Sequence, residues 1–221
     1  MEGKIAIVIG GTGLVGTSLL EQLVADSRYT EIVAIGRSKP SVESSKISFV
    51  ENDLSAPKTA AEFLFGDDLF ICIGTTIKKA QTQDAFRFVD YTIPKKIAKH
   101  ARKNGVKRIA AVSSVGAHRK SGNFYLKMKG KMEEAIIGEA FKRTVILRPS
   151  LLLGNRKEVR VAESIGRKLA PFANLLLWGR KMRKYRAVKA AEVAAAMIHY
   201  LNLDIKGVDI IHYDQIKRVK R

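Results

Sequence analysis

Cysteine is nearly absent from this 221-residue chain, which contains only Cys72. A single thiol excludes an internal disulfide and is typical of a reducing compartment. Long apolar runs are also absent, and no stretch approaches the ~18 residues of a membrane-spanning helix. The first apolar run, residues 5–9, has the length of a strand and follows no basic leader-type segment. We therefore expect a cytoplasmic protein with no membrane span, in which Cys72 is a small core residue.

Acidic side chains are scarce, especially after residue 70. The chain carries 40 Lys and Arg against 21 Asp and Glu, and the net charge is −4 over residues 1–70 and +23 over residues 71–221. The densest basic run is residues 180–186. This distribution is typical of a solvated basic face or, alternatively, of a surface that attracts a phosphate, an anionic substrate, lipid or nucleic acid. No zinc-finger spacing or RNA-binding aromatic pattern accompanies it, which argues against nucleic acid.

Strand and helix patterns alternate along the whole chain. This alternation predicts an α/β fold, a doubly wound parallel sheet of about seven strands in a single domain, residues 1–221. We expect residues 151–187, the least regular region, to form a small substrate-binding insertion, a C-terminal lid. The predicted strands are 4–9, 31–35, 46–51, 68–73, 107–112, 143–147 and 208–212. The predicted helices are 14–26, part of 56–65, part of 88–104, 122–139, 159–169 and 188–202.

A glycine-rich turn joins the first strand to the first helix. In this order of elements, Gly11 would allow a tight turn, Gly13 a close approach to a pyrophosphate and Gly16 close packing of the helix. The helix N-terminus would offer free N–H groups to the phosphates. The pattern predicts a dinucleotide site whose first loop holds the cofactor through Gly10, Thr12, Gly13, Leu14, Val15 and Gly16.

The end of the second strand indicates which dinucleotide binds. NAD-binding units place a carboxylate there, whereas this chain has Arg37 and Ser38. An arginine can clamp a 2′-phosphate, which favours NADP(H) over NAD(H); the alternative is that Arg37 stacks on adenine without discriminating. We expect Asp53 and Leu54 to flank the adenine, although Asp53 also fits an ordinary loop. Small residues Gly74, Thr75 and Thr76 follow the fourth strand, where a cofactor would cross the sheet.

A Tyr-x-x-x-Lys pair is a candidate proton-transfer site, because both side chains share a helix face and the ammonium favours tyrosinate. The spacing occurs four times, so context must choose. Only Tyr125 follows a buried strand that ends in paired serines, and we assign Tyr125 and Lys129, with Ser114 favoured over Ser113. The alternative is a surface tyrosine on a basic helix. The four histidines and one cysteine show no metal-ligand spacing, so we predict no metal.

These stretches together resemble the short-chain dehydrogenase/reductase superfamily in its atypical branch, which has an NAD(P)-binding Rossmann fold and includes the NAD-dependent epimerase/dehydratase-like proteins. Within that branch the chain is similar to the Tat-interacting-protein-like oxidoreductases. The resemblance rests on residues 10–16, 36–37, 72–76, 89–91, 112–117, 123–130 and 147–149. It implies that Tyr125 donates and accepts the proton beside Lys129, and that Arg148 approaches the cofactor or substrate. Asp90 departs from the family, since many members carry a relay asparagine at that position.

Two hypotheses follow from these residues. The first is an NADP(H)-dependent oxidoreductase that transfers hydride to or from a small carbonyl substrate, which would be anionic if the basic surface attracts it. The second is a redox-sensing regulator or scaffold that binds NADPH and presents a basic face to a partner. A sugar-nucleotide epimerase is a third reading, weakened because only about 70 residues follow Arg148.

Overall fold

A computed structural model describes residues 3–55, 60–154 and 185–219. Seven parallel strands form one sheet in the order β3-β2-β1-β4-β5-β6-β9. The strands are β1 (Lys4–Ile9), β2 (Tyr29–Gly36), β3 (Ile47–Glu51), β4 (Asp68–Ile71), β5 (Arg108–Val112), β6 (Arg143–Leu147) and β9 (Gly207–Ile211). All seven lie within two residues of the predicted bounds, so the predicted doubly wound α/β sheet is confirmed.

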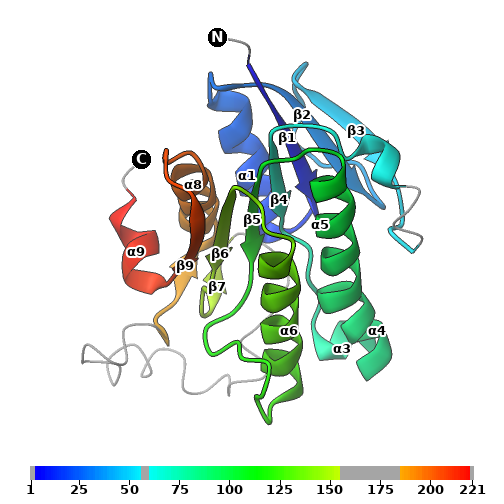
Figure 1. Ribbon diagram of the computed structural model, residues 1–221, viewed down its shortest axis with the longest axis vertical. Helices are drawn as coiled ribbons and strands as arrows, with labels where there is room; N and C mark the ends of the chain where they lie inside the picture. Colours follow the sequence, from blue (N-terminus) through cyan, green and yellow to red (C-terminus); the bar gives the residue numbers. More distant parts are fainter. Residues whose placement is uncertain (1–2, 56–59, 155–184, 220–221) are drawn as a thin grey trace.

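Helices cover both faces of this sheet (Figure 1). One face packs against α1 (Leu14–Ala25) and α8 (Ala190–Leu201), and the other against α5 (Ile93–Lys103) and α6 (Phe124–Gly138). The two apolar layers include Leu19, Leu23, Val193 and Met197 on the first face, and Ile97, Ala101, Met132 and Ile136 on the second. Because helices cover both faces of the sheet, the side chains that point to either face are apolar, which explains the continuous apolar runs in the sequence.

Two of the remaining elements fall where part of 56–65 and part of 88–104 were predicted to be helical, and the others escape the sequence patterns. All of these elements are only two to six residues long. They are η1 (Ala61–Phe63), α3 (Ile77–Ala80), α4 (Gln83–Arg87), η2 (Phe88–Thr92), β7 (Leu152–Leu153), β8 (Val188–Lys189) and α9 (Tyr213–Arg218). Strand β7 pairs with β8, which brings together the chain on either side of the predicted insertion. The predicted helix 159–169, most of the predicted lid 151–187 and most of the basic run 180–186 lie outside the described residues.

The strand order fixes where a ligand can enter. Strands β2 and β3 lie successively on one side of β1, whereas β4 lies on the other side of β1. This reversal opens a crevice at the carboxyl ends of β1 and β4, where open parallel sheets bind their ligands. The glycine turn after β1 and the small residues after β4 therefore meet at the same edge.

Candidate functional site

The turn after β1 packs directly against the loop after β4. Gly10 has a φ of +88°, and a Cβ there would lie 2.8 Å from the backbone nitrogen of Ile73. A Cβ on Gly16 would lie 2.1 Å from the carbonyl oxygen of Gly10. The sequence predicted the tight turn at Gly11. The residue with a left-handed backbone conformation is instead Gly10. Gly11 is buried and faces Leu20 instead.

The start of α1 faces this crevice without a side-chain cap. Its N-cap residue is Gly13, whose own N–H donates to the carbonyl of Gly10 at 3.0 Å. Because Gly13 has no side chain, the N–H groups of the first turn stay available to an anion. Thr12 is exposed in the same turn, whereas Leu14 is half-buried and Val15 is buried as the helix begins.

Arg37 and Ser38 are exposed immediately after β2, and Asp53 is exposed after β3. Hydrogen bonds from Ser55, the backbone one at 2.8 Å, lower the pKa of Asp53, and the positive charge of Arg37 lowers it further. Leu54, which is buried, has a φ of +60°, an uncommon conformation for a bulky residue. The structure thus places the four residues predicted for the ribose and adenine on two adjacent strand ends.

A buried ion pair stands beside the end of β4. Asp90 and Lys129 are 1% and 5% exposed, and the Lys129 Nζ lies 2.8 Å from Asp90 Oδ1. The other carboxylate oxygen accepts the N–H of Thr75 at 2.8 Å. A Cβ on Gly74 would lie 3.3 Å from Asp90 Oδ1 and 3.6 Å from Lys129 Nζ, so the small residue leaves room for the pair. Thr76 is used differently, because its hydroxyl caps the N-terminus of α3.

The π-helical turn η2 places Asp90 inside the protein. Ile93 N–H donates to the carbonyl of Phe88, five residues back, directly before Pro94. Proline has no N–H and cannot continue the regular helical ladder, which accounts for the wider turn. The displaced backbone directs Asp90 toward α6. Pro94 lies in the first turn of α5, where a proline is tolerated, and the π turn before it has no signal in the sequence patterns.

Lys129 keeps its positive charge despite burial. Burial alone would lower its pKa, but the Asp90 carboxylate, with smaller contributions from Tyr125 and Glu133, holds the pKa above its ordinary value. Tyr125, Lys129 and Glu133 are spaced four residues apart and share one face of α6. The Tyr125 ring is half-buried and packs edge-on against Phe86 of α4, with centroids 5.7 Å apart.

The two serines after β5 have different surroundings. Ser113 is buried and its hydroxyl donates to Glu133 Oε1, whereas Ser114 is half-buried and its hydroxyl donates only to the carbonyl of Val115 at 3.3 Å. Arg148, at the end of β6, donates to both oxygens of Glu133, at 2.9 and 2.5 Å. The buried Glu133 therefore ties together β5, β6 and α6.

The loop between the serines and α6 is fixed to the first turns of that helix. His118 N–H donates to the carbonyl of Leu126 at 3.2 Å, and a Cβ on Gly116 would lie 3.4 Å from the Leu126 side chain. Asp90 thus contacts Lys129 and Thr75 beside Gly74, and Tyr125 lies on the same face of α6 as Lys129, one turn earlier. The loop that carries the serines is held against this part of α6 through Leu126. Sequence reasoning missed Glu133 and Phe86. The i+4 spacing from Lys129 was the available signal for Glu133, whereas nothing marked Phe86.

Two expected absences concern metals and membranes. Over residues 3–55, 60–154 and 185–219, no three His, Cys, Asp or Glu side chains are grouped so that they could hold a metal ion. No helix in these same ranges has both the length and the apolar character needed to span a membrane.

Comparison with known proteins identifies relatives of the chain. Residues 10–202 match the NAD(P)H-binding family. Protein FMP52-1, mitochondrial, from Scheffersomyces stipitis is 39% identical over 155 residues, which are 69% of each chain. Protein FMP52, mitochondrial, from Debaryomyces hansenii is 33% identical over 203 residues, 88% of this chain and 86% of the relative.

The fold has solved counterparts. The Bordetella bronchiseptica enzyme WbmG in complex with NAD superposes with a TM-score of 0.69 at 16% sequence identity, over 96% of this chain and 73% of WbmG. At this identity the likeness shows the fold alone, a Rossmann-type α/β domain.

The predicted cytoplasmic address is contradicted by the relatives. Those that are 33–42% identical are named mitochondrial proteins. The expectation rested on a single cysteine and on the absence of a leader-type pattern, and a low cysteine content does not separate one reducing compartment from another.

The resemblance to NAD(P)-binding Rossmann proteins is, in contrast, confirmed. The glycine turn, the switch point between β1 and β4 and the match over residues 10–202 all lead to the same assignment. The chain belongs to the NAD(P)H-binding family, with FMP52 proteins among its relatives.

Proposed function

We propose that this protein is an oxidoreductase that transfers hydride between NADP(H) and a small carbonyl or alcohol substrate at Ser114, Tyr125 and Lys129. The observation that carries the proposal is the buried Asp90–Lys129 pair, held next to Gly74 and Thr75 at the switch point. This ammonium lies one helical turn after Tyr125 and beside Gly74, which supports a role for Lys129 next to both the tyrosine and the cofactor.

In this proposal the glycine turn and the start of α1 bind the pyrophosphate, and Arg37 with Ser38 bind the 2′-phosphate of the adenosine ribose. Asp53 and Leu54 flank the adenine, and Gly74, Thr75 and Thr76 line the path toward the nicotinamide. NADP(H) supplies the hydride chemistry when it is bound. The family assignment supports a nicotinamide cofactor, and Arg37 supports the choice of NADP(H).

Tyr125 exchanges the proton with the substrate oxygen, and Ser114 donates a hydrogen bond to that oxygen. In this proposal Lys129, one helical turn after Tyr125, binds the ribose hydroxyls of the cofactor. Asp90 takes the place of a relay asparagine by pairing with Lys129 directly. We assign Arg148 to cofactor or substrate binding together with its partner Glu133, which holds the guanidinium by two hydrogen bonds.

Tyr125→Phe tests the proposal. With a panel of small aldehydes, ketones and keto acids and NADPH, the variant should lose at least ~100-fold in kcat, the lower end of general acid–base catalysis. Its affinity for NADPH, measured by fluorescence titration, should change less than threefold. Tyr91→Phe is the matched control, because Tyr91 has the same spacing to Lys95 but stands on η2. Equal turnover by Tyr125→Phe and wild-type protein would remove Tyr125 from the reaction.

A further inference from the structure

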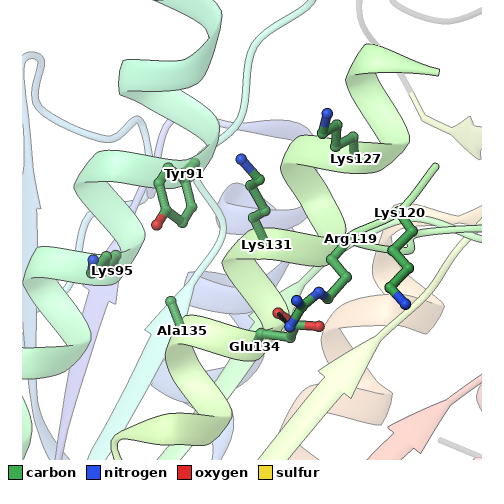
Figure 2. Close-up of a pocket in the computed structure, with 8 residues that line it drawn as sticks. All are labelled: Tyr91, Lys95, Arg119, Lys120, Lys127, Lys131, Glu134 and Ala135. Carbon is green, nitrogen blue, oxygen red and sulfur yellow. Dashed lines mark hydrogen bonds and ion pairs between the residues drawn. The ribbon is translucent and has the colours of Figure 1, made fainter. Parts of the chain in front are cut away.

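A strongly basic hollow lies on the molecular surface next to α5 and α6, on the opposite side of α6 from Tyr125 and Lys129. It has a volume of about 630 Å³, and Figure 2 shows the side chains that line it. Positions 127 and 131 are each two residues from 125 and 129, about half a helical turn, so Lys127 and Lys131 project away from the proposed active site. The hollow is therefore separate from the cofactor crevice.

Five cations and one carboxylate line this hollow. Lys127, Lys131 and Glu134 come from α6, Lys95 comes from α5, and Arg119 with Lys120 come from the loop before α6. The single carboxylate is already engaged, since Glu134 pairs with Arg119 at 3.3 Å. Five cations and one carboxylate leave a net charge of +4 around one hollow, which attracts an anion.

The loop that supplies Arg119 and Lys120 is rigidly placed on α6. A Cβ on Gly130 would lie 2.3 Å from the backbone carbon of His118 and 2.4 Å from the backbone nitrogen of Arg119, so only glycine permits this approach. Within the turn, Ser121 N–H donates to the carbonyl of His118 at 2.9 Å, and Lys120 N–H donates to His118 Nδ1 at 3.2 Å. The backbone of these two cations is thus ordered before any ligand binds.

The other side of the hollow is also organised. In Figure 2, Tyr91 and Lys95 lie on the helix next to α6, and the Lys131 side chain extends toward Tyr91. The Lys95 ammonium lies 5.7 Å from the centre of the Tyr91 ring, a cation–π contact that orients it. Tyr91 is the sole aromatic side chain among the residues that line the hollow, which leaves no series of rings for stacking successive bases.

The shape and charge of the hollow select the class of ligand. The hollow, of about 630 Å³, is open to solvent and lined mainly by charged side chains, so charge and not enclosure selects the ligand. A second copy of this protein is not a suitable partner, because contact between two such faces would bring five cations against five. A concave arrangement of cations from three segments fits a compact ligand of high charge density, and linked phosphates carry more charge in a small volume than carboxylates. Lysine ammonium groups and arginine both bind phosphate well.

We propose that the hollow formed by Lys95, Arg119, Lys120, Lys127 and Lys131 is a second anion site, which binds a short chain of linked phosphates, free or as part of a nucleotide. It is occupied independently of the dinucleotide at the glycine turn. The proposal does not depend on the oxidoreductase activity, and it gives the basic surface a specific ligand class.

The test is calorimetric titration of the full chain with tripolyphosphate, in which binding at the glycine turn is common to all variants and cancels when they are compared. The triple variant Lys95→Gln, Lys127→Gln, Lys131→Gln should bind tripolyphosphate at least tenfold more weakly than wild type. The matched variant Lys103→Gln, Lys107→Gln, Lys206→Gln removes the same charge from exposed lysines outside the hollow and should change the affinity less than threefold. Equal midpoints of thermal unfolding in the wild type and both variants verify that each is folded.

Further ligands separate the sources of the phosphates. ATP that binds at least as tightly as tripolyphosphate, and loses affinity in the hollow variant only, would identify a nucleotide as the ligand and support the proposal. Citrate should bind at least tenfold more weakly than tripolyphosphate. Equal weakening in the two triple variants, equal binding of citrate, or binding of anionic vesicles or duplex DNA without binding of tripolyphosphate would each overturn it.

Discussion

Asp90 and Lys129 form an ion pair of 2.8 Å in the protein interior, where both side chains are almost completely buried. Removing one charge leaves the other buried without compensation, which costs roughly 3–5 kcal/mol in comparable pairs. We therefore expect Asp90→Asn to lower the free energy of unfolding, measured in urea, by that amount. Asp84→Asn, on the exposed surface of α4, is the matched control and should change it by less than about 0.5 kcal/mol.

Asp90→Asn should also change how Lys129 makes the free energy of unfolding depend on pH. In the wild type the pKa of Lys129 is raised above 10.5, so the stabilisation is complete below pH 10.5 and is lost as the pH rises through the folded-state value. Without Asp90, burial dominates and the pKa falls below 10.5, so that protein gains stability as the pH rises toward 10.5. Unfolding is measured from pH 8 to 11, each protein relative to its Lys129→Met derivative. The contribution should stay level to pH 10.5 and then fall in the wild type, and should rise toward pH 10.5 in Asp90→Asn. Parallel slopes would mean that Asp90 does not control Lys129.

Substitution of Ser113 should affect mainly stability, whereas substitution of Ser114 should affect mainly turnover. Ser113→Ala removes a buried hydrogen bond to Glu133 and should destabilise the protein by about 1–3 kcal/mol, because Glu133 is left underpaired. Ser114→Ala should leave the free energy of unfolding within about 0.5 kcal/mol. If Ser114 acts on the substrate as proposed, its loss lowers kcat by at least ~100-fold. Urea unfolding and NADPH turnover of both variants decide this, and the reversed pattern would move the catalytic role to Ser113.

The sheet could be predicted from the sequence because each strand is buried on both sides and so appears as a continuous apolar run. Candidate site residues could be predicted only where they form a short-range sequence pattern, as with Gly10–Gly16 and the Tyr125–Lys129 pair. Glu133 is less visible, because its partners Ser113 and Arg148 stand 20 and 15 residues away in the chain. The π turn that buries Asp90 depends on one missing N–H at Pro94, which has no periodic signature.

Arg37 should determine the choice of cofactor. Charge-assisted hydrogen bonds contribute about 1.5–3 kcal/mol, so Arg37→Glu should weaken NADP+ binding by roughly 10- to 150-fold and leave NAD+ binding nearly unchanged. Lys39→Glu makes the same charge change two residues later on the exposed surface and serves as the control. Titration of each protein with both cofactors gives the answer. An equal loss of NADP+ and NAD+ affinity would indicate that Arg37 stacks on the adenine instead.

Gly16 should tolerate no side chain, since a Cβ would lie 2.1 Å from the carbonyl oxygen of Gly10. Gly16→Ala must therefore displace the turn after β1, and we expect a loss of several kcal/mol in stability or, where the protein still folds, at least a tenfold loss of cofactor affinity. Gly138, at the end of α6, meets nothing within 4 Å. Gly138→Ala should be neutral or stabilising by up to about 1 kcal/mol. Thermal unfolding and cofactor titration of the pair test whether the turn is as tightly packed as its geometry indicates.

Cys72 should be unreactive in the folded protein. Burial raises the pKa of its thiol to about 12, and its sulfur lies 3.9 Å from that of Met197. Because the thiolate is the reactive form and the side chain is partly buried, a thiol reagent at pH 8 should modify Cys72 much more slowly in the native protein than in urea, where it reacts at the ordinary cysteine rate. The raised pKa also means that the folded state holds this proton through the interval from pH 9 to about 12, so Cys72 lowers stability as the pH rises there, and Cys72→Ala should make that decline shallower. Rapid modification of the native protein would instead indicate a sensor thiol.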